Sequence, residues 1–166
     1  MSIILSRRSV RKYTGERVTD DQVTELLKAA MSAPSAGNQQ PWHFVVVRSQ
    51  EVLDRISAVH PYAAMASHAS VVIAVCGDPT GLKWADYWVQ DCSAATENVL
   101  LAAHEMGLGA VWLGVYPIEE RVEDIRELLR LPRQVIPLSL VAVGYPAESH
   151  PAADRFDAGR VHYDQW

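Results

Sequence analysis

Apolar and polar positions follow two different spacings along this chain, and these spacings predict helices and strands in turn. Helical spacing of apolar residues occurs over 19–32, 49–59, 84–106 and 118–129, with a shorter alanine-rich segment over 61–69. Runs of β-branched and aromatic residues predict strands over 42–47, 70–76, 109–115 and 137–143. No internal repeat or linker divides the pattern, so we expect a single domain over residues 1–166.

Cap residues mark the starts of two of these helices. Thr19 followed by Gln22 matches a capping box, and Ser49 is the expected cap of the helix over 49–59. The helix over 84–106 is apolar nearly all round, which indicates burial on most sides. In a domain this small, we expect it to pack against its own sheet and a second subunit. A central helix of a monomer is the alternative. The strand over 70–76 is apolar on both faces, which favours a central place in the sheet.

A polar loop over 33–42 separates the first predicted helix from the first strand. Pro34 and Pro41 fix the backbone near its two ends, and Gly37 with Asn38 tolerates positive φ. The loop also carries a cluster of hydroxyl and amide groups. It is either a rigid binding loop or a turn whose side chains cap its own backbone.

Composition excludes several function classes. The chain has 166 residues, 49% of them hydrophobic, and a formal net charge of −5, which argues against disorder and against general nucleic-acid binding. It contains no apolar run of membrane-spanning length and no signal-peptide pattern at its start. Cys76 and Cys92 lie in apolar segments without a CxxC motif, so we expect reduced core cysteines and a cytoplasmic protein.

Basic residues concentrate near the N-terminus. Arg7, Arg8, Ser9 and Arg11 combine guanidinium groups with a hydroxyl, which suits a phosphate group. A solvated, charged turn is the alternative. Elsewhere the sequence lacks an HExxH zinc motif, a Walker loop and a nucleophile elbow. Segments rich in anion-binding and amide side chains, but without catalytic side chains, fit an enzyme whose chemistry is carried by a phosphate-bearing cofactor.

Four segments together resemble the FMN-dependent nitroreductase family. Arg7–Tyr13 resembles the family's N-terminal signature, and Pro34–Trp42 resembles its second signature. Gly109–Gly114 is similar to the third, and Gly144–Pro146 with the tail around Arg155 is similar to a fourth. The four occur in family order over nearly the whole chain. The short span between 77 and 84 leaves little room for the helical insertion of longer members, so the resemblance is to a short member.

This resemblance implies a fold and an assembly. The fold would be α+β, with a central mixed sheet flanked by helices, in an intertwined homodimer that holds two FMN molecules at its interface. The helix over 84–106 would form the dimer core, and the C-terminal tail would wrap around the partner subunit.

The resemblance also implies the binding residues. The phosphate and ribityl end of FMN would be held by Arg7, Arg8, Ser9, Arg11 and Arg155. The flavin ring would be contacted from the other subunit by Pro34, Ser35, Ala36 and Asn38. Leu113 and Gly114 would lie against the ring, with a backbone N–H near flavin N5.

The implied activity is an oxidoreductase with ping-pong kinetics. NAD(P)H as co-substrate would pass a hydride to flavin N5, and a small nitroaromatic- or quinone-like acceptor would then take the electrons. The resemblance requires no catalytic side chain and no metal. An FMN-binding protein without NAD(P)H turnover, such as a flavin carrier or sensor, is the alternative.

Overall fold

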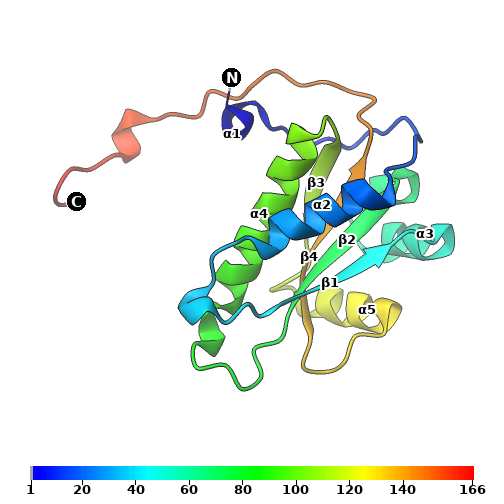
Figure 1. The fold of residues 1–166 in the computed structure, drawn as a ribbon, viewed down its shortest axis with the longest axis horizontal. Helices are drawn as coiled ribbons and strands as arrows, with labels where there is room; N and C mark the ends of the chain where they lie inside the picture. Colours follow the sequence, from blue (N-terminus) through cyan, green and yellow to red (C-terminus); the bar gives the residue numbers. More distant parts are fainter. Residues whose placement is uncertain (1) are drawn as a thin grey trace.

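A four-stranded sheet with helices on both faces forms the body of the protein (Figure 1). The computed structural model describes residues 2–166. The strands are β1 (Trp42–Val47), β2 (Val71–Gly77), β3 (Gly109–Gly114) and β4 (Ile136–Gly144), in the order β1-β2-β4-β3. β2 therefore lies inside the sheet, as its apolar pattern predicts, and β3 is an edge strand.

The α+β class is confirmed, but the expectation of a mixed sheet needs correction. All three neighbouring strand pairs are antiparallel. The parallel component is an isolated bridge between Ser9 and Ala110 at the free edge of β3. Hydrophobic patterns locate strands in the sequence but do not determine which strands become neighbours, so strand direction was not readable from them.

The helices cover the two faces of the sheet in different groups. One face packs against α2 (Asp20–Met31) and α4 (Trp88–Glu105), and the other against α3 (Gln50–Val59) and α5 (Glu119–Leu129). The remaining elements are α1 (Ile3–Ser6) and the short 3₁₀ helices η1 (Ala36–Asn38), η2 (Ala64–His68), η3 (Ala85–Tyr87) and η4 (Ala158–Arg160).

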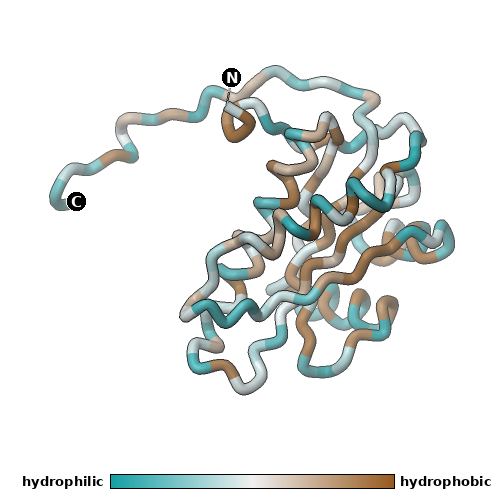
Figure 2. The backbone as a smooth tube through the Cα atoms, viewed as in Figure 1, coloured by the Kyte–Doolittle hydropathy of each residue, from teal (hydrophilic) through white to brown (hydrophobic). Residues whose placement is uncertain are grey.

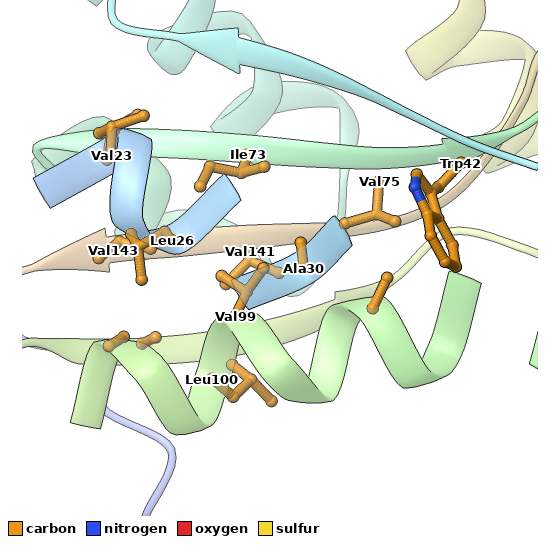
Figure 3. Close-up of a cluster of buried hydrophobic side chains, with 14 of the residues drawn as sticks. Val23, Leu26, Ala30, Trp42, Ile73, Val75, Val99, Leu100, Val141 and Val143 are labelled. Atoms are coloured by element: carbon orange, nitrogen blue, oxygen red, sulfur yellow. The ribbon is translucent and has the colours of Figure 1, made fainter. Parts of the chain in front are cut away.

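Alternation along β2 divides the core into two layers. Ile73 and Val75 pack toward α2 and α4, whereas Val72 and Ala74 pack toward α3 and α5. Figure 3 shows the first layer, with Ala30 and other α2 side chains beside the strands and α4 below them. In Figure 2 the most hydrophobic segments follow these inner strands. The strands thus give the domain a rigid sheet whose β3 edge can carry a site.

The expected helix starts are confirmed in part. Thr19 Oγ1 accepts from the Gln22 backbone N–H, and the Gln22 side chain accepts from the Thr19 N–H, which completes the capping box. The Ser49 side chain makes no cap hydrogen bond among the described residues, and the Val52 N–H, which a side-chain cap would bind, donates to the Ser49 carbonyl. The segment over 84–106 begins as η3, and its regular α-helix starts at Trp88.

Helix α4 is covered largely by its own chain. It packs against α2, the sheet and α1, and buries Cys92, Ala95 and Val99. The central-helix alternative therefore accounts for much of its apolar surface. The C-terminal tail behaves differently, since it leaves the body and extends past α1 (Figure 1). Its aromatic residues Phe156 and Trp166 are 81% and 101% exposed.

Candidate functional site

The N-terminal segment lies against the free edge of β3. The Val10 N–H donates to the Ala110 carbonyl at 3.0 Å, next to the Ser9–Ala110 bridge. This approach requires a glycine on the strand, because a Cβ at Gly109 would lie 2.6 Å from the Val10 side chain. The first glycine of the third motif therefore has a packing role, and residues 9–10 cover only the first half of the β3 edge.

The same N-terminal segment is hydrogen-bonded to the residues that follow β4. Thr14 N–H donates to the Tyr145 carbonyl at 3.0 Å, and Ala147 N–H donates to the Lys12 carbonyl at 2.8 Å. Arg11 N–H donates to a Glu148 carboxylate oxygen at 2.7 Å. This backbone hydrogen bond, the largest cause, lowers the pKa of Glu148 below its ordinary value. The two ends of the chain thus hold each other beside the sheet.

Arginines from both chain ends meet in one pocket, which we call the anion pocket. It has a volume of about 260 Å³. Its lining residues are Arg7, Arg8, Ser9, Arg11, His150 and Arg155. All five residues expected to hold the cofactor's phosphate end are therefore brought together, including Arg155 from the distant tail.

The anion pocket has an excess of positive charge. Arg7 Nε lies 3.6 Å from Glu97, while Arg7 Nη1 is buried and has no hydrogen-bond partner within residues 2–166. Over the same residues, Arg8, Arg11 and Arg155 form no salt bridge. Unpaired guanidinium donors converging with a hydroxyl fit a phosphate monoester.

A second pocket follows along β3, and we call it the edge pocket. It has a volume of about 430 Å³. Its lining residues are Arg11, His60, Tyr62, Ala64, Met65, Trp112, Leu113 and Gly114. Arg11 is common to both pockets, so they adjoin. Leu113 and Gly114 thus line a pocket next to the anion pocket, and their contact with a flavin ring stays a prediction.

Gly114 leaves an open approach to the β3 backbone. A Cβ built there has no neighbouring atom within 4 Å, in contrast to Gly109. Ala110 directs its carbonyl to the free edge, and the hydrogen-bonding direction of a β-strand alternates, so Gly114 directs its N–H and C=O to the same edge. An open backbone donor beside an anion pocket fits a planar, hydrogen-bonding ring that carries a phosphate, as FMN does.

The loop of the second motif lies outside both pockets. None of Pro34, Ser35, Ala36 and Asn38 lines either pocket in the described chain. Gly37 and Asn38 have positive φ values of 57° and 55°, and Ser35 Oγ accepts from the Gln40 N–H at 3.0 Å. The self-capping alternative therefore holds in part. Contact of this loop with the partner's flavin stays a prediction.

Sequence reasoning missed several lining residues. His60 and Tyr62 line the edge pocket, and His150 lines the anion pocket. Glu148 supports the anion pocket through Arg11. A single histidine or glutamate outside a recognised motif does not indicate a binding site, so the roles of these residues become visible only in the fold.

Other kinds of site find no support in the described residues. Across residues 2–166, no group of three His, Cys, Asp or Glu side chains could hold a metal ion. No helix in that range has the length and apolar character needed to cross a membrane.

The chain matches the family model described as the nitroreductase family over residues 4–60 and 57–145. It belongs to the nitroreductase family. A relative from Methanothermobacter thermautotrophicus, provisionally named NADH dehydrogenase/NAD(P)H nitroreductase, is 51% identical over 166 residues, covering 100% of this chain and 87% of the relative. The family assignment is therefore supported along the full length of the chain.

Solved structures of similar proteins have the same fold. A provisionally named NADH oxidase from Clostridium acetobutylicum has 44% identity and a TM-score of 0.95, with 99% of each chain covered. A provisionally named nitroreductase from Desulfovibrio desulfuricans, solved in complex with FMN, has 33% identity and a TM-score of 0.84. That alignment covers 99% of this chain and 95% of the other.

Proposed function

We propose that this protein is an FMN-dependent oxidoreductase that uses NAD(P)H to reduce a small organic acceptor of the nitroaromatic or quinone kind. The observation that carries the proposal is the adjoining pair of pockets, one rich in unpaired arginine and one exposing strand backbone, joined at Arg11. Family membership and the FMN complex of the Desulfovibrio desulfuricans relative agree with it.

The chain's own residues bind and orient the cofactor. Arg7, Arg8, Ser9, Arg11 and Arg155 hold the phosphate end by charge-assisted hydrogen bonds. Gly114 admits the ring to the β3 edge and offers it a backbone donor. When bound, FMN supplies two-electron chemistry by accepting a hydride from NAD(P)H and returning the electrons to the acceptor. The protein contributes placement and fixed dipoles, so no acid or nucleophile is required.

The proposed active unit is a homodimer with two FMN molecules at its interface. Exposed apolar groups support this assembly, because Ile4 and Leu5 of α1 are 67% and 62% exposed next to the tail that carries Phe156. A partner surface would cover them. The loop residues Pro34, Ser35, Ala36 and Asn38 then reach the ring bound by the other subunit.

A spectrum of the purified protein tests the function. We expect flavin absorbance that is bleached by anaerobic NADH or NADPH and restored by a nitroaromatic compound or a quinone. A protein that takes up no FMN would overturn the proposal. A protein that binds FMN but is not bleached by either nucleotide would instead be a flavin carrier or sensor.

Sedimentation tests the assembly. We expect a dimer whose FMN affinity falls on dilution into the monomer range, because a site completed by two subunits is lost with them. A monomer that retains FMN tightly at low concentration contradicts the dimer but leaves the anion pocket in place. Buried, free Cys76 and Cys92 agree with a reducing compartment, and we propose the cytoplasm.

A further inference from the structure

The carbonyl of Gly114 receives two side-chain hydrogen bonds. His60 Nε2 lies 2.9 Å from it, and Arg121 Nη1 donates to it at 3.1 Å. His60 is 2% exposed, so this contact is buried on the histidine side. A carbonyl at the end of an edge strand can be satisfied by water alone, so two converging protein donors indicate that its direction is fixed.

Hydrogen bonding determines the tautomer of His60. The Tyr62 backbone N–H donates to His60 Nδ1 at 3.2 Å, so Nδ1 must be an acceptor. The ring proton of the neutral imidazole then lies on Nε2, where it donates to the Gly114 carbonyl. Only this tautomer satisfies both contacts, and it makes His60 a rigid donor with no role as an acceptor toward a ligand.

Arg121 completes the same arrangement from another element. It lies near the start of α5, and its guanidinium is 5.4 Å from the centre of the Tyr62 ring. The turn after α3, the end of β3 and the start of α5 therefore converge on one glycine. Tyr62 lines the edge pocket, so Arg121 contacts both a lining side chain and the glycine carbonyl.

A glycine in this position needs outside support. Glycine has the widest backbone freedom of all residues, and Gly114 has no side chain to anchor it. Its N–H and C=O point to the same free edge of β3. Fixing the carbonyl therefore restricts the backbone torsions of Gly114, and with them the freedom of the N–H that faces the edge pocket.

We propose that His60 and Arg121 are positioning residues that hold Gly114 so that its N–H is aimed at the flavin ring. The proposal rests on the proposed function, because it assumes that the ring occupies the edge pocket. The support comes from contacts within this chain, which are the hydrogen bonds of His60 and Arg121 to the Gly114 carbonyl.

The first experiment measures FMN binding to apoprotein by fluorescence quenching. His60→Phe and Arg121→Met remove one donor each, and we expect each to weaken FMN binding by about 2- to 12-fold, the value of one hydrogen bond. His60→Gln and Arg121→Lys keep a donor and should recover most of the loss. His43→Phe on the far edge strand β1 and the exposed Arg133→Met are matched controls and should bind FMN like the parent.

The second experiment measures the backbone mobility of Gly114 directly. Order parameters of the Gly114 amide, measured by ¹⁵N relaxation on apoprotein, should fall in the double variant His60→Phe/Arg121→Met and remain high in the parent. Reduction by NAD(P)H at saturating FMN should be slower in the same variant. The thermal midpoint of each variant identifies any general loss of folding, and His60→Gln keeps the test valid if His60→Phe is unstable.

Different results would contradict the positioning role of His60 and Arg121 and the proposed function. Equal order parameters and equal FMN affinity in the parent and the double variant would overturn the positioning role. Equal losses in His60→Gln and His60→Phe would also overturn it, because the donor would then be irrelevant. If the parent protein binds no FMN, the proposed function is wrong, and Gly114 cannot direct its N–H toward a flavin ring. Normal FMN uptake with unaffected variants defeats only the positioning role.

Discussion

The anion pocket and the edge pocket adjoin at Arg11, yet they are built from different parts of the polypeptide. The anion pocket is made mainly of basic side chains from both chain ends, and within residues 2–166 Arg8, Arg11 and Arg155 have no ionic partner. The edge pocket is lined mainly by apolar and aromatic side chains and exposes strand backbone at Gly114, whose carbonyl is bonded to buried His60. We infer that one region retains the cofactor and the other orients it.

The largest expected effect concerns orientation. Gly114→Val places a branched side chain where the ring lies, and a misplaced ring should slow reduction by NAD(P)H roughly 100-fold even at saturating FMN. The fold should survive, because a Cβ at Gly114 meets no atom within 4 Å. Stopped-flow absorbance measures the rate.

Gly109→Val is the matched control for Gly114→Val. Its Cβ would lie 2.6 Å from the Val10 side chain, so it should lower the thermal midpoint. A normal reduction rate in Gly114→Val would show that the flavin ring does not lie in the edge pocket.

The next effect concerns retention. Arg7→Ala and Arg11→Ala each remove a charge-assisted bond worth about 1.5–3 kcal/mol, which corresponds to about 10- to 150-fold in FMN affinity. Excess FMN should restore most of the turnover. Fluorescence titration gives the affinity, and stopped-flow at saturating FMN gives the rate.

Arg17→Ala is the control for these variants, since Arg17 is near the same segment but is exposed and paired with Asp20. If Arg11→Ala remained slow at saturating FMN while Gly114→Val were fast, the two pockets would have exchanged roles.

A smaller effect concerns the support of the anion pocket. The folded-state pKa of Glu148 is lowered from 4.5, mainly by the Arg11 N–H. Its carboxylate therefore stabilises the fold above about pH 4.5, and this contribution is lost as pH falls through the lower folded pKa. The thermal midpoint of Glu148→Gln should lie below that of the parent at pH 7, and the gap should narrow on acidification below pH 4.5. A gap that widens there would contradict the assignment.

The smallest effect is expected from the thiols, which belong to neither pocket. Burial raises the pKa of Cys76 and of Cys92 to about 12, so both remain protonated near neutrality. A disulfide exchange reagent at pH 8 should react with neither thiol in the native protein and with both after unfolding in guanidinium. FMN content should be unchanged by the treatment. Rapid reaction of the native protein would show that the layers around β2 open readily.

The two pockets also differ in how much of them the sequence predicts. Arg7, Arg8, Ser9 and Arg11 are adjacent in sequence, and their charge alone suggests an anion. The edge pocket could be approached only through the motif around Gly114, because backbone groups look alike at every residue. His60 and Arg121 bond to the Gly114 carbonyl, and the residues next to them in sequence do not predict this contact.

For the fold, local signals were reliable and long-range ones were not. The capping box at Thr19 and the apolar run of β2 follow from neighbouring residues, and both are confirmed. The pairing of β3 with β4 in an antiparallel sheet depends on which distant segments meet. Ser49 illustrates the limit, since it stands at the N-cap position as expected but its side chain makes no cap hydrogen bond within the described residues.

The joining of the two chain ends has a consequence for biosynthesis. The hydrogen bond from Arg11 to Glu148 spans 137 residues of sequence, and Arg155 lies later still. Contacts of such separation form late in folding, after most of the chain has become available. Arg7, Arg8 and Arg11 therefore line a complete anion pocket only after the segment that carries His150 and Arg155 has been synthesised and has docked beside them. Under the proposed function, FMN would gain its full set of phosphate contacts only after that docking.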